Sequence, residues 1–324
     1  MLAIFSGACY IFSERYSAET ASDGNVRCLE RRCVHGMKIG IIGAGRVGCS
    51  VGKYLTDRGK TVTGYYSQTY GNAAKAAEFT GTDCFRTMEE LVALSDTLFI
   101  ASTDGQIGAV WDCMKGMSVN GRIVCHFSGS LSSEVFTGID EKEAYGVSVH
   151  PMLAFRDKFS SYEQLKDCFF TLEGHPYALA QIKMLLEELG NPYCLIKAED
   201  KARYHCAASI LSNAVVALLD IGFSLLGQCG FSEKEALAAA RALVQGNVEN
   251  VLANGTVPVM TGPVLRGDAA TVEKHLNVLA GEEREIYRLL GKRLLKMAES
   301  RKERDGGSMV WNEGHAMLEE ILKE

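Results

Sequence analysis

Four side chains able to form hydrogen bonds recur at every fourth position of the stretch "KARYHCAASILSN", residues 201–213. They are Lys201, His205, Ser209 and Asn213, and on a helix these positions form one stripe. Lys201 and Asn213 would lie about 18 Å apart along the helix axis, so one small substrate could not contact both. We therefore predict one wall of an elongated cleft, with Lys201, His205 and Asn213 as candidate catalytic residues and Ser209 as a candidate substrate ligand. The alternative is the polar face of a surface helix.

A second segment, "MTGPVLRGDAATVEKH" (260–275), combines a turn with a cationic side chain. Gly262 and Pro263 predict the turn, and Asp268 is a good helix N-cap. Neither the turn nor the N-cap accounts for Arg266. Its guanidinium group can bind a carboxylate or a phosphate through two hydrogen bonds. Arg266 is therefore a candidate ligand for a substrate carboxylate or a cofactor phosphate.

A glycine-rich turn follows the short apolar run "KIGII" (38–42) and precedes a helix-periodic segment that ends near Gly59. The glycines fit G-x-G-x-x-G, in which the first permits a tight turn, the second admits a pyrophosphate and the third lets the helix pack on the strand. Between a strand and a helix, this pattern predicts dinucleotide binding rather than a turn without a ligand. The predicted cofactor-binding loop is Gly43, Ala44, Gly45, Arg46, Val47 and Gly48.

The next predicted strand (60–67) ends at Ser67, which Gln68 and Thr69 follow. In dinucleotide-binding folds an acidic residue at this place binds the ribose 2′-hydroxyl, and its carboxylate would repel a 2′-phosphate. Because no acidic residue is present, we expect Ser67 to contact NADP(H), with NAD(H) the less favoured cofactor.

Three further predicted strands, 96–103, 121–129 and 145–152, also end in polar side chains. Ligands of doubly wound sheets bind at the carboxyl ends of the strands. We expect Ser102, Thr103, Asp104 and Ser128 to contact the cofactor, and Ser130 and His150 to contact the substrate. Polar residues after a strand are often only helix N-caps, and His150 could equally be a structural histidine.

The elements that must position these residues change character near residue 198. Before it, strands alternate with helices, including a helix predicted at 132–142, which indicates a doubly wound parallel sheet. After it, helices are predicted at 198–229, 233–253, 268–280, 282–303 and near 310–322. We predict an α/β fold with a Rossmann domain over 37–197 and an all-helical domain over 198–324. Residues 1–36 are expected to be a disordered leader, an over-extended start or a targeting peptide.

Composition narrows the function classes. The formal net charge of -6 and the pI near 5.7 argue against a nucleic-acid or anionic-membrane surface. No unbroken run of about 18 apolar residues occurs, so we expect no membrane span. The eleven cysteines show no ligand spacing for a metal, and Cys49, Cys84, Cys125, Cys206 and Cys229 are expected to be buried free thiols. These features favour a cytoplasmic protein without a metal.

The quoted segments, with "GIIGAGRVG", "HFSGSLSSEVF", "SVHPMLAF" and "MTGPVLRGD", resemble a group of bacterial proteins. These join a Rossmann-like domain to a helical domain of the 6-phosphogluconate dehydrogenase C-terminal type, and the resemblance covers roughly residues 37–290. Some members resemble an alternative class of ketopantoate reductase, which implies NADPH-dependent reduction of 2-dehydropantoate. Helical domains of this type usually pair, so the resemblance implies a homodimer.

The wider superfamily includes β-hydroxyacid dehydrogenases, whose helix carries a proton-supplying Lys and, four residues on, a substrate-holding Asn. Lys201 matches that Lys, but His205 occupies the place of that Asn, and the next Asn is Asn213. We therefore expect hydride transfer to a small carbonyl, with Lys201 or His205 as the acid or polarising group. The alternatives are an imine reductase of the pyrroline-carboxylate type and a non-catalytic NADP(H)-binding sensor or scaffold.

Overall fold

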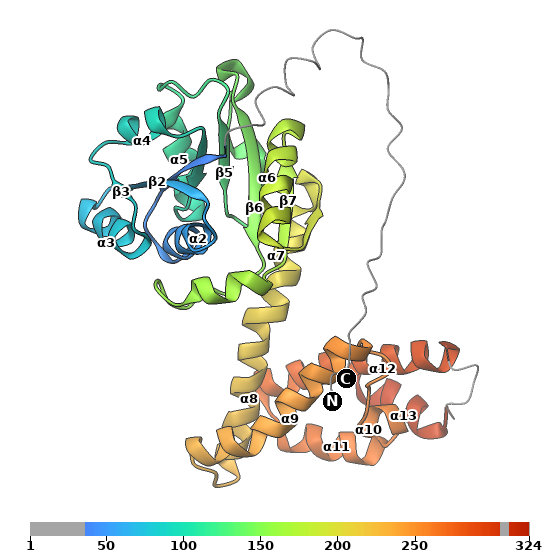
Figure 1. Cartoon of the computed structure of the whole chain (residues 1–324). Helices are drawn as coiled ribbons and strands as arrows, with labels where there is room; N and C mark the ends of the chain where they lie inside the picture. The colour runs from blue at the N-terminus through green and yellow to red at the C-terminus, as the bar shows by residue number, and fades with distance from the viewer. Residues whose placement is uncertain (1–35, 305–310, 324) are drawn as a thin grey trace, which may run out of the picture. The chain divides into compact units, whose positions relative to one another are not determined.

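The computed structural model describes residues 36–304 and 311–323, and its first part is a sheet with helices on both faces (Figure 1). The strand order is β3-β2-β1-β4-β5-β6-β7-β8. The strands are β1 (Lys38–Ile42), β2 (Thr61–Tyr66), β3 (Asp83–Cys84), β4 (Thr97–Ile100), β5 (Ile123–His126), β6 (Tyr145–Pro151), β7 (Phe170–Gly174) and β8 (Tyr193–Leu195). The predicted α/β fold is confirmed. The expectation for a leader at 1–36 falls, except for Gly36, outside the described residues.

The sheet departs from an all-parallel arrangement at one place. β6 and β7 pair antiparallel, with Val147 opposite Gly174 and Pro151 opposite Phe170, whereas the other neighbouring strands are parallel. A parallel neighbour needs a crossover connection, usually a helix. The segment between β6 and β7 has only the 3-10 turn Ser161–Asp167, so the chain reverses instead.

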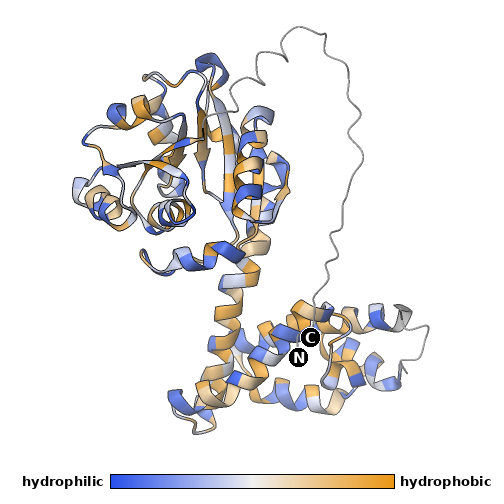
Figure 2. Ribbon diagram, in the orientation of Figure 1, coloured by the Kyte–Doolittle hydropathy of each residue, from blue (hydrophilic) through white to orange (hydrophobic). Residues whose placement is uncertain are grey.

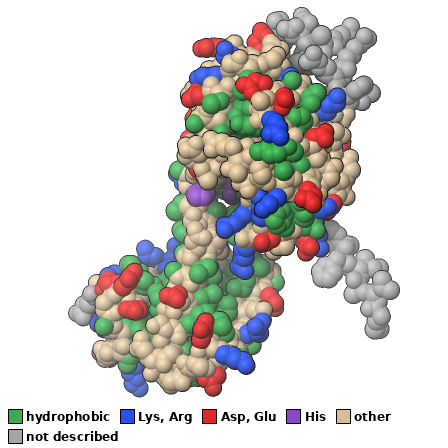
Figure 3. All heavy atoms as spheres, turned by 90° about the vertical axis from the view of Figure 1, so that its left-hand side faces the viewer, with side chains coloured by type: hydrophobic (Ala, Val, Ile, Leu, Met, Phe, Trp, Pro, Cys, Tyr) green, Lys and Arg blue, Asp and Glu red, His purple; other side chains and the backbone are tan. Residues whose placement is uncertain are grey.

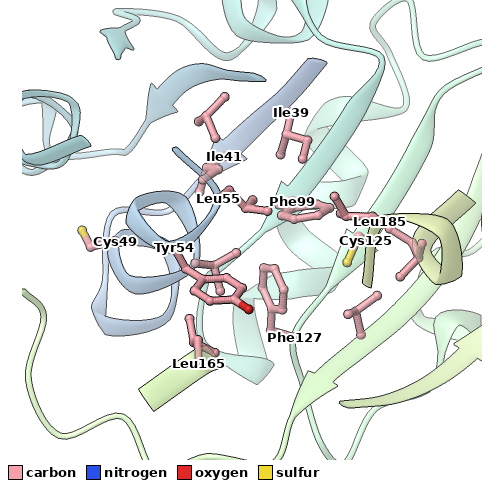
Figure 4. Packing of buried hydrophobic residues seen from close by; sticks show 14 of the residues in the cluster. Ile39, Ile41, Cys49, Tyr54, Leu55, Phe99, Cys125, Phe127, Leu165 and Leu185 are labelled. Atoms are coloured by element: carbon pink, nitrogen blue, oxygen red, sulfur yellow. The ribbon is translucent and has the colours of Figure 1, made fainter. Parts of the chain in front are cut away.

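Successive side chains of the central strands point into two separate hydrophobic cores on opposite faces of the sheet. Ile39 and Ile41 of β1 face a core covered by α2 (Arg46–Thr56), α3 (Tyr70–Thr80) and α6 (Pro176–Leu189), part of which Figure 4 shows. Ile42 faces the opposite core, which α4 (Met88–Leu94) and α5 (Asp104–Met114) cover. Burial on both faces explains why these strands read as continuous apolar runs.

A glycine and a tyrosine fasten β2 to the first helix. A Cβ placed on Gly52 of α2 would lie 1.7 Å from the hydroxyl oxygen of Tyr65, so only glycine leaves room for that ring. The fully buried Tyr65 then donates a hydrogen bond of 3.2 Å to the carbonyl oxygen of Gly48. The side chain therefore ties the strand to the predicted phosphate-binding turn.

The helix predicted at 132–142 is wrong. The structure has two 3-10 turns, Ser133–Val135 and Asp140–Lys142, separated by Gly138 with a φ of 71°. That left-handed conformation interrupts any helix. The apolar periodicity that suggested one instead places Phe136 against Trp111 in the second core.

The second part of the chain is helical. The long run begins with a 3-10 turn (Ala198–Asp200) and continues as α7 (Lys201–Ser209), a π-helical segment (Ile210–Ala214) and α8 (Val215–Gln228). It is followed by α9 (Glu233–Asn254), α10 (Pro263–Arg266), α11 (Ala269–Val278), α12 (Gly281–Arg304) and α13 (Glu313–Ile321). The first compact unit ends at Ala208 and the second begins at Ser209. The second unit has its own small core, which includes Val272, Leu276 and Leu318.

Two findings in the helical part bear on expectations from the sequence. In the described part of the chain, the run Ala198–Gln228 is long and apolar enough, by length and composition, to cross a membrane (Figure 2). The search for an unbroken apolar run overlooked it because Asn213 and Asp220 interrupt the sequence. Cys206 and Cys229, expected to be buried, are exposed, because the helices that carry them bury little of their surface. Cys49 and Cys125 are buried as expected, and Cys84 is half-buried.

Candidate functional site

A cavity of about 420 Å³ opens at the carboxyl ends of β1, β2 and β4. Its walls include six of the predicted cofactor ligands, namely Gly43, Ala44, Gly45, Ser67, Ser102 and Thr103. The other predicted loop residues lie beside it: Arg46 is exposed, Val47 packs against the first core and Gly48 is buried under the turn. Tyr66, Gln68, Asn72 and Met88 also line the cavity, and none of its lining residues carries a carboxylate.

The turn after β1 has the backbone that a dinucleotide requires. Gly43 has a φ of 105°, and a Cβ there would lie 2.8 Å from the carbonyl oxygen of Ala101. A Cβ on Gly48 would lie 2.1 Å from the carbonyl oxygen of Gly43, whereas one on Gly45 would have open space around it. Close packing is thus imposed at the first and third glycines, and free room remains at the second, where a pyrophosphate would approach.

Two further observations fit a phosphate-bearing ligand. Gly45 is the N-cap of α2 and cannot cap it with a side chain, and the first turn of α2 holds no acidic residue. Its N–H groups are therefore suited to an anion. In addition, the Oγ atom of Ser102 is buried without a hydrogen-bond partner in the protein, although the residue lines the cavity. A buried hydroxyl without a protein partner fits a site in which a bound ligand supplies the hydrogen bond.

Asp104 connects the ends of β4 and β5. Its carboxylate accepts hydrogen bonds from Ser128 Oγ at 2.8 Å and from Ser130 Oγ at 2.9 Å. Ser128 Oγ also accepts hydrogen bonds from the backbone N–H groups of Ser130 and Leu131. The three predicted side chains therefore meet, and their mutual bonds fix the turn after β5.

Lys201 lies beneath this turn rather than in open space. It is 2% exposed, and its Nζ donates hydrogen bonds to the carbonyl oxygen of Ser128 at 2.9 Å and to Ser148 Oγ at 2.7 Å. Burial lowers the pKa of Lys201 to about 8, against the opposite influence of the carboxylates of Glu173 and Asp104. Its ammonium group therefore acts on the site through the Ser128 turn.

His126 is a buried structural histidine of the same turn. Its Nδ1 accepts a hydrogen bond from the N–H of Ser128 at 3.1 Å, so Nε2 carries the proton and donates to the carbonyl oxygen of Ser132. Burial lowers the pKa of His126 to about 4, which keeps the ring neutral at pH 7.

This neutral histidine predicts acid sensitivity. The unfolded chain, with an ordinary histidine pKa near 6.5, binds more protons than the folded chain between about pH 6.5 and 4. The free energy of unfolding should therefore fall as the pH falls through that window, by up to about 3 kcal/mol from His126. Urea unfolding of wild type and His126→Asn at several pH values checks this, and equal slopes in the two proteins would contradict it.

His150 and His205 flank the glycine at the tip of the turn. Nδ1 of His150 is 2.6 Å from the hydroxyl of Tyr204, and a Cβ on Gly129 would lie 2.6 Å from the His205 ring and 2.9 Å from His150 Nε2. Burial first, and then the charge of Lys201, lowers the pKa of His150 to about 4. No hydrogen bond of His205, or of His150 Nε2, is formed with a described protein group. The two imidazoles are thus available to a ligand.

The remaining predicted residues belong to the second unit, and none of the hydrogen bonds described above involves them. Ser209 ends α7, Asn213 lies in the exposed π-helical segment, and Arg266 is the exposed last residue of α10. The backbone carbonyl of Arg266 accepts a hydrogen bond from the side chain of Asn312. Binding of an anion by the Arg266 guanidinium group stays a prediction.

Sequence reasoning missed Tyr204 and Ser148, although both contact predicted residues. Tyr204 lies in the stretch "KARYHC" but off the fourfold stripe, and Ser148 precedes the predicted His150 by two positions on β6. The alternation of β6 alone could have identified Ser148, since residues two apart on a strand share a face.

Comparisons with known proteins agree with this architecture. Residues 27–151 match the model of a Rossmann-like domain, and residues 168–294 match a model described as a domain of unknown function, DUF2520. No curated protein matches the chain.

Several solved structures share the fold. A protein from Thermotoga maritima is 28% identical with a TM-score of 0.65, covering 82% of this chain and 99% of that one. A protein from Bacteroides fragilis, provisionally described as an NADP oxidoreductase, is 21% identical with a TM-score of 0.62, covering 80% and 98%. An imine reductase from a Pseudomonas species is 15% identical with a TM-score of 0.57, covering 89% and 100%. The chain is therefore similar in fold, over most of its length, to these three proteins.

Proposed function

We propose that this protein is an NADP(H)-dependent reductase of a small carbonyl or imine compound. The observation that carries the proposal is the cavity beside Gly43 and Gly45, which contains the orphaned hydroxyl of Ser102 and no carboxylate. A neutral, hydroxyl-rich wall accepts a ribose 2′-phosphate, whereas a carboxylate would favour the 2′-hydroxyl of NAD(H). The names of the similar oxidoreductase from Bacteroides fragilis and imine reductase from Pseudomonas point in the same direction.

The side chains beyond the Ser128 turn suit reduction. A bound nicotinamide would supply the hydride, and negative charge then develops on the substrate oxygen or electron density on its nitrogen. His205, with no protein hydrogen bond in the described part of the chain, is the candidate proton donor, and His150 Nε2 is a candidate hydrogen-bond donor. Lys201 contributes a positive charge and holds the Ser128 carbonyl, so we assign it a positioning role.

The substrate class remains a choice between two related reactions. The resemblance to ketopantoate reductases favours a 2-oxo acid such as 2-dehydropantoate, with Arg266 or Asn213 as the candidate carboxylate ligand. An imine reductase would need similar proton donors. A sensor that binds NADP(H) without turnover is the second candidate, and it has no need of two free imidazoles beside one turn.

Oxidation of NADPH by the full-length protein, measured with a panel of 2-oxo acids and cyclic imines, tests this function. We expect turnover with at least one class. His205→Gln should then lower kcat by about 100-fold or more, while the affinity for NADPH changes by less than about twofold. Tight NADPH binding without turnover on any compound would favour the sensor, and no binding of NADPH would exclude both.

We also propose a homodimer, because large apolar side chains are exposed on the π-helical segment, on α8 and on α9. The most exposed of them are Ile210, Leu211, Val216, Leu243 and Leu252, with exposed fractions of 59–81%. Hydrophobic side chains also reach the surface on the face shown in Figure 3. Apolar patches of this kind mark interaction sites. α9 also carries Arg241 and Glu249, which do not fit the interior of a bilayer, so a second copy of the chain is the better partner.

A further inference from the structure

Strand pairing brings an arginine, distant in sequence, beside the end of β2. β3 pairs with β2 so that Tyr65 lies opposite Cys84, and the N–H of Phe85 donates to the carbonyl oxygen of Tyr65 at 2.9 Å. Continuing this register places Arg86 alongside Ser67. Ser67 lines the cavity at the position where the ribose of a bound dinucleotide is recognised.

The side chain of Arg86 packs on an aromatic ring. Its guanidinium carbon lies 4.6 Å from the centroid of the Tyr70 ring, the first residue of α3. Residues two positions away on both segments line the cavity, namely Gln68 and Asn72 around Tyr70, and Met88 after Arg86. Arg86 and Tyr70 are not wall residues themselves, but sequence neighbours of both contribute to the wall.

The charge of Arg86 is not neutralised within the described residues, where its guanidinium group forms no ion pair with a carboxylate. Glu90, the acidic residue that contacts this segment, accepts hydrogen bonds from the backbone N–H groups of Arg86 and Thr87, and thereby caps α4. α3 has no acidic residue in its first turn and no side-chain cap from Thr69. An exposed guanidinium, an uncapped helix start and a wall without carboxylates together favour an anion.

We propose that Arg86, stacked on Tyr70, binds the 2′-phosphate of NADP(H) and sets the preference for NADP(H) over NAD(H). This inference rests on the proposed dinucleotide function and adds the residues that distinguish the two cofactors. Ser67 and Gln68 would supply neutral hydrogen bonds to the same phosphate, and Tyr70 would keep the guanidinium plane in place.

The chain offers a matched control for this assignment. Arg58 also stacks on a tyrosine, with its guanidinium carbon 3.9 Å from the Tyr54 centroid. No residue within two positions of Arg58 or Tyr54 lines the cavity, whereas sequence neighbours of Arg86 and Tyr70 do, and the Tyr54 hydroxyl donates to Asn191 at 2.5 Å. Substitution of Arg58 therefore measures the effect of losing a stacked arginine, and substitution of Arg86 measures in addition the loss of the proposed phosphate ligand.

The test is fluorescence titration of full-length wild type, Arg86→Gln, Arg86→Lys and Arg58→Gln with NADPH and with NADH. We expect Arg86→Gln to raise the Kd for NADPH about 10- to 100-fold and to leave the Kd for NADH within about twofold. Arg86→Lys should fall between, because it keeps the charge and loses the planar fork. Arg58→Gln should change neither Kd.

The possible results are distinguishable. An equal loss for both cofactors in Arg86→Gln, or an unchanged Kd for NADPH, would overturn the assignment and leave the reductase proposal standing. Failure of wild type to bind either cofactor would overturn the reductase proposal itself. Urea unfolding of each variant confirms folding, and the exposure of Arg86 makes a large loss of stability there unexpected.

Discussion

Gly48→Ala is expected to abolish measurable NADPH binding and to destabilise the protein by about 1–2 kcal/mol, while Gly45→Ala should fold normally and only bind more weakly. The difference follows from what each new methyl group would meet. At position 48 it would lie 2.1 Å from the carbonyl oxygen of Gly43, so α2 would have to move away from β1. Overpacking of this kind costs about 1–3 kcal/mol or more, which exceeds the roughly 1 kcal/mol that alanine gains over glycine in a helix.

At position 45 the methyl group meets no protein atom within 4 Å, and the φ of -83° suits alanine. The protein should therefore keep its stability. The methyl group would occupy the space through which a pyrophosphate approaches the turn, so we expect the Kd for NADPH to rise about 10-fold or more. Urea unfolding and NADPH titration of both variants check the pair. An unchanged Kd for NADPH in Gly45→Ala would show that the pyrophosphate does not lie on this turn.

Val216→Glu and Leu243→Glu are expected to convert the protein from a dimer into a monomer. Val216 of α8 is 66% exposed and Leu243 of α9 is 69% exposed, so a charge at either site costs little in a single chain. In a dimer the same carboxylate would be buried without a partner, at a cost of about 3 kcal/mol or more. The dimer Kd should then rise at least about 100-fold for each substitution.

Sedimentation velocity of the detergent-free protein measures this directly. The control is Leu94→Glu, because Leu94 ends α4 in the first unit, is 57% exposed and lies on neither α8 nor α9. That variant should remain a dimer. A monomeric wild type would refute the homodimer, and recovery of wild type only with membranes would assign the apolar helix run to a bilayer instead.

The sequence was sufficient for the architecture because its signals are local. The strand, the three glycines and the helix of the dinucleotide motif occur in one short segment. Short apolar runs identified most strands, and helical periodicity identified the helices of the second half. The reason for the glycine in the turn Ser128 to Ser130 could not be foreseen in the same way. Gly129 needs to be glycine because His150 and His205 approach it from two other elements, and such contacts exist only after folding.

Arg86 and Lys201 show two further limits of sequence reasoning. Arg86 reaches the end of β2 only through the register of β3, a strand of two residues that gives little periodic signal. Lys201 was correctly placed on a helix beside the strand ends, but a stripe of polar residues does not reveal which of them is buried. Its depth depends on Ser128 and Ser148, acceptors contributed by distant segments.

The pairing of Gly52 with Tyr65 has a consequence for how this protein can diverge. Since the tyrosine hydroxyl occupies the space of the missing side chain, a larger residue at position 52 becomes tolerable only after position 65 has lost that hydroxyl or shrunk further. The reverse order is open, because a smaller ring leaves a void rather than a clash. In descendants of this sequence, a substitution of Tyr65 should therefore precede any substitution of Gly52.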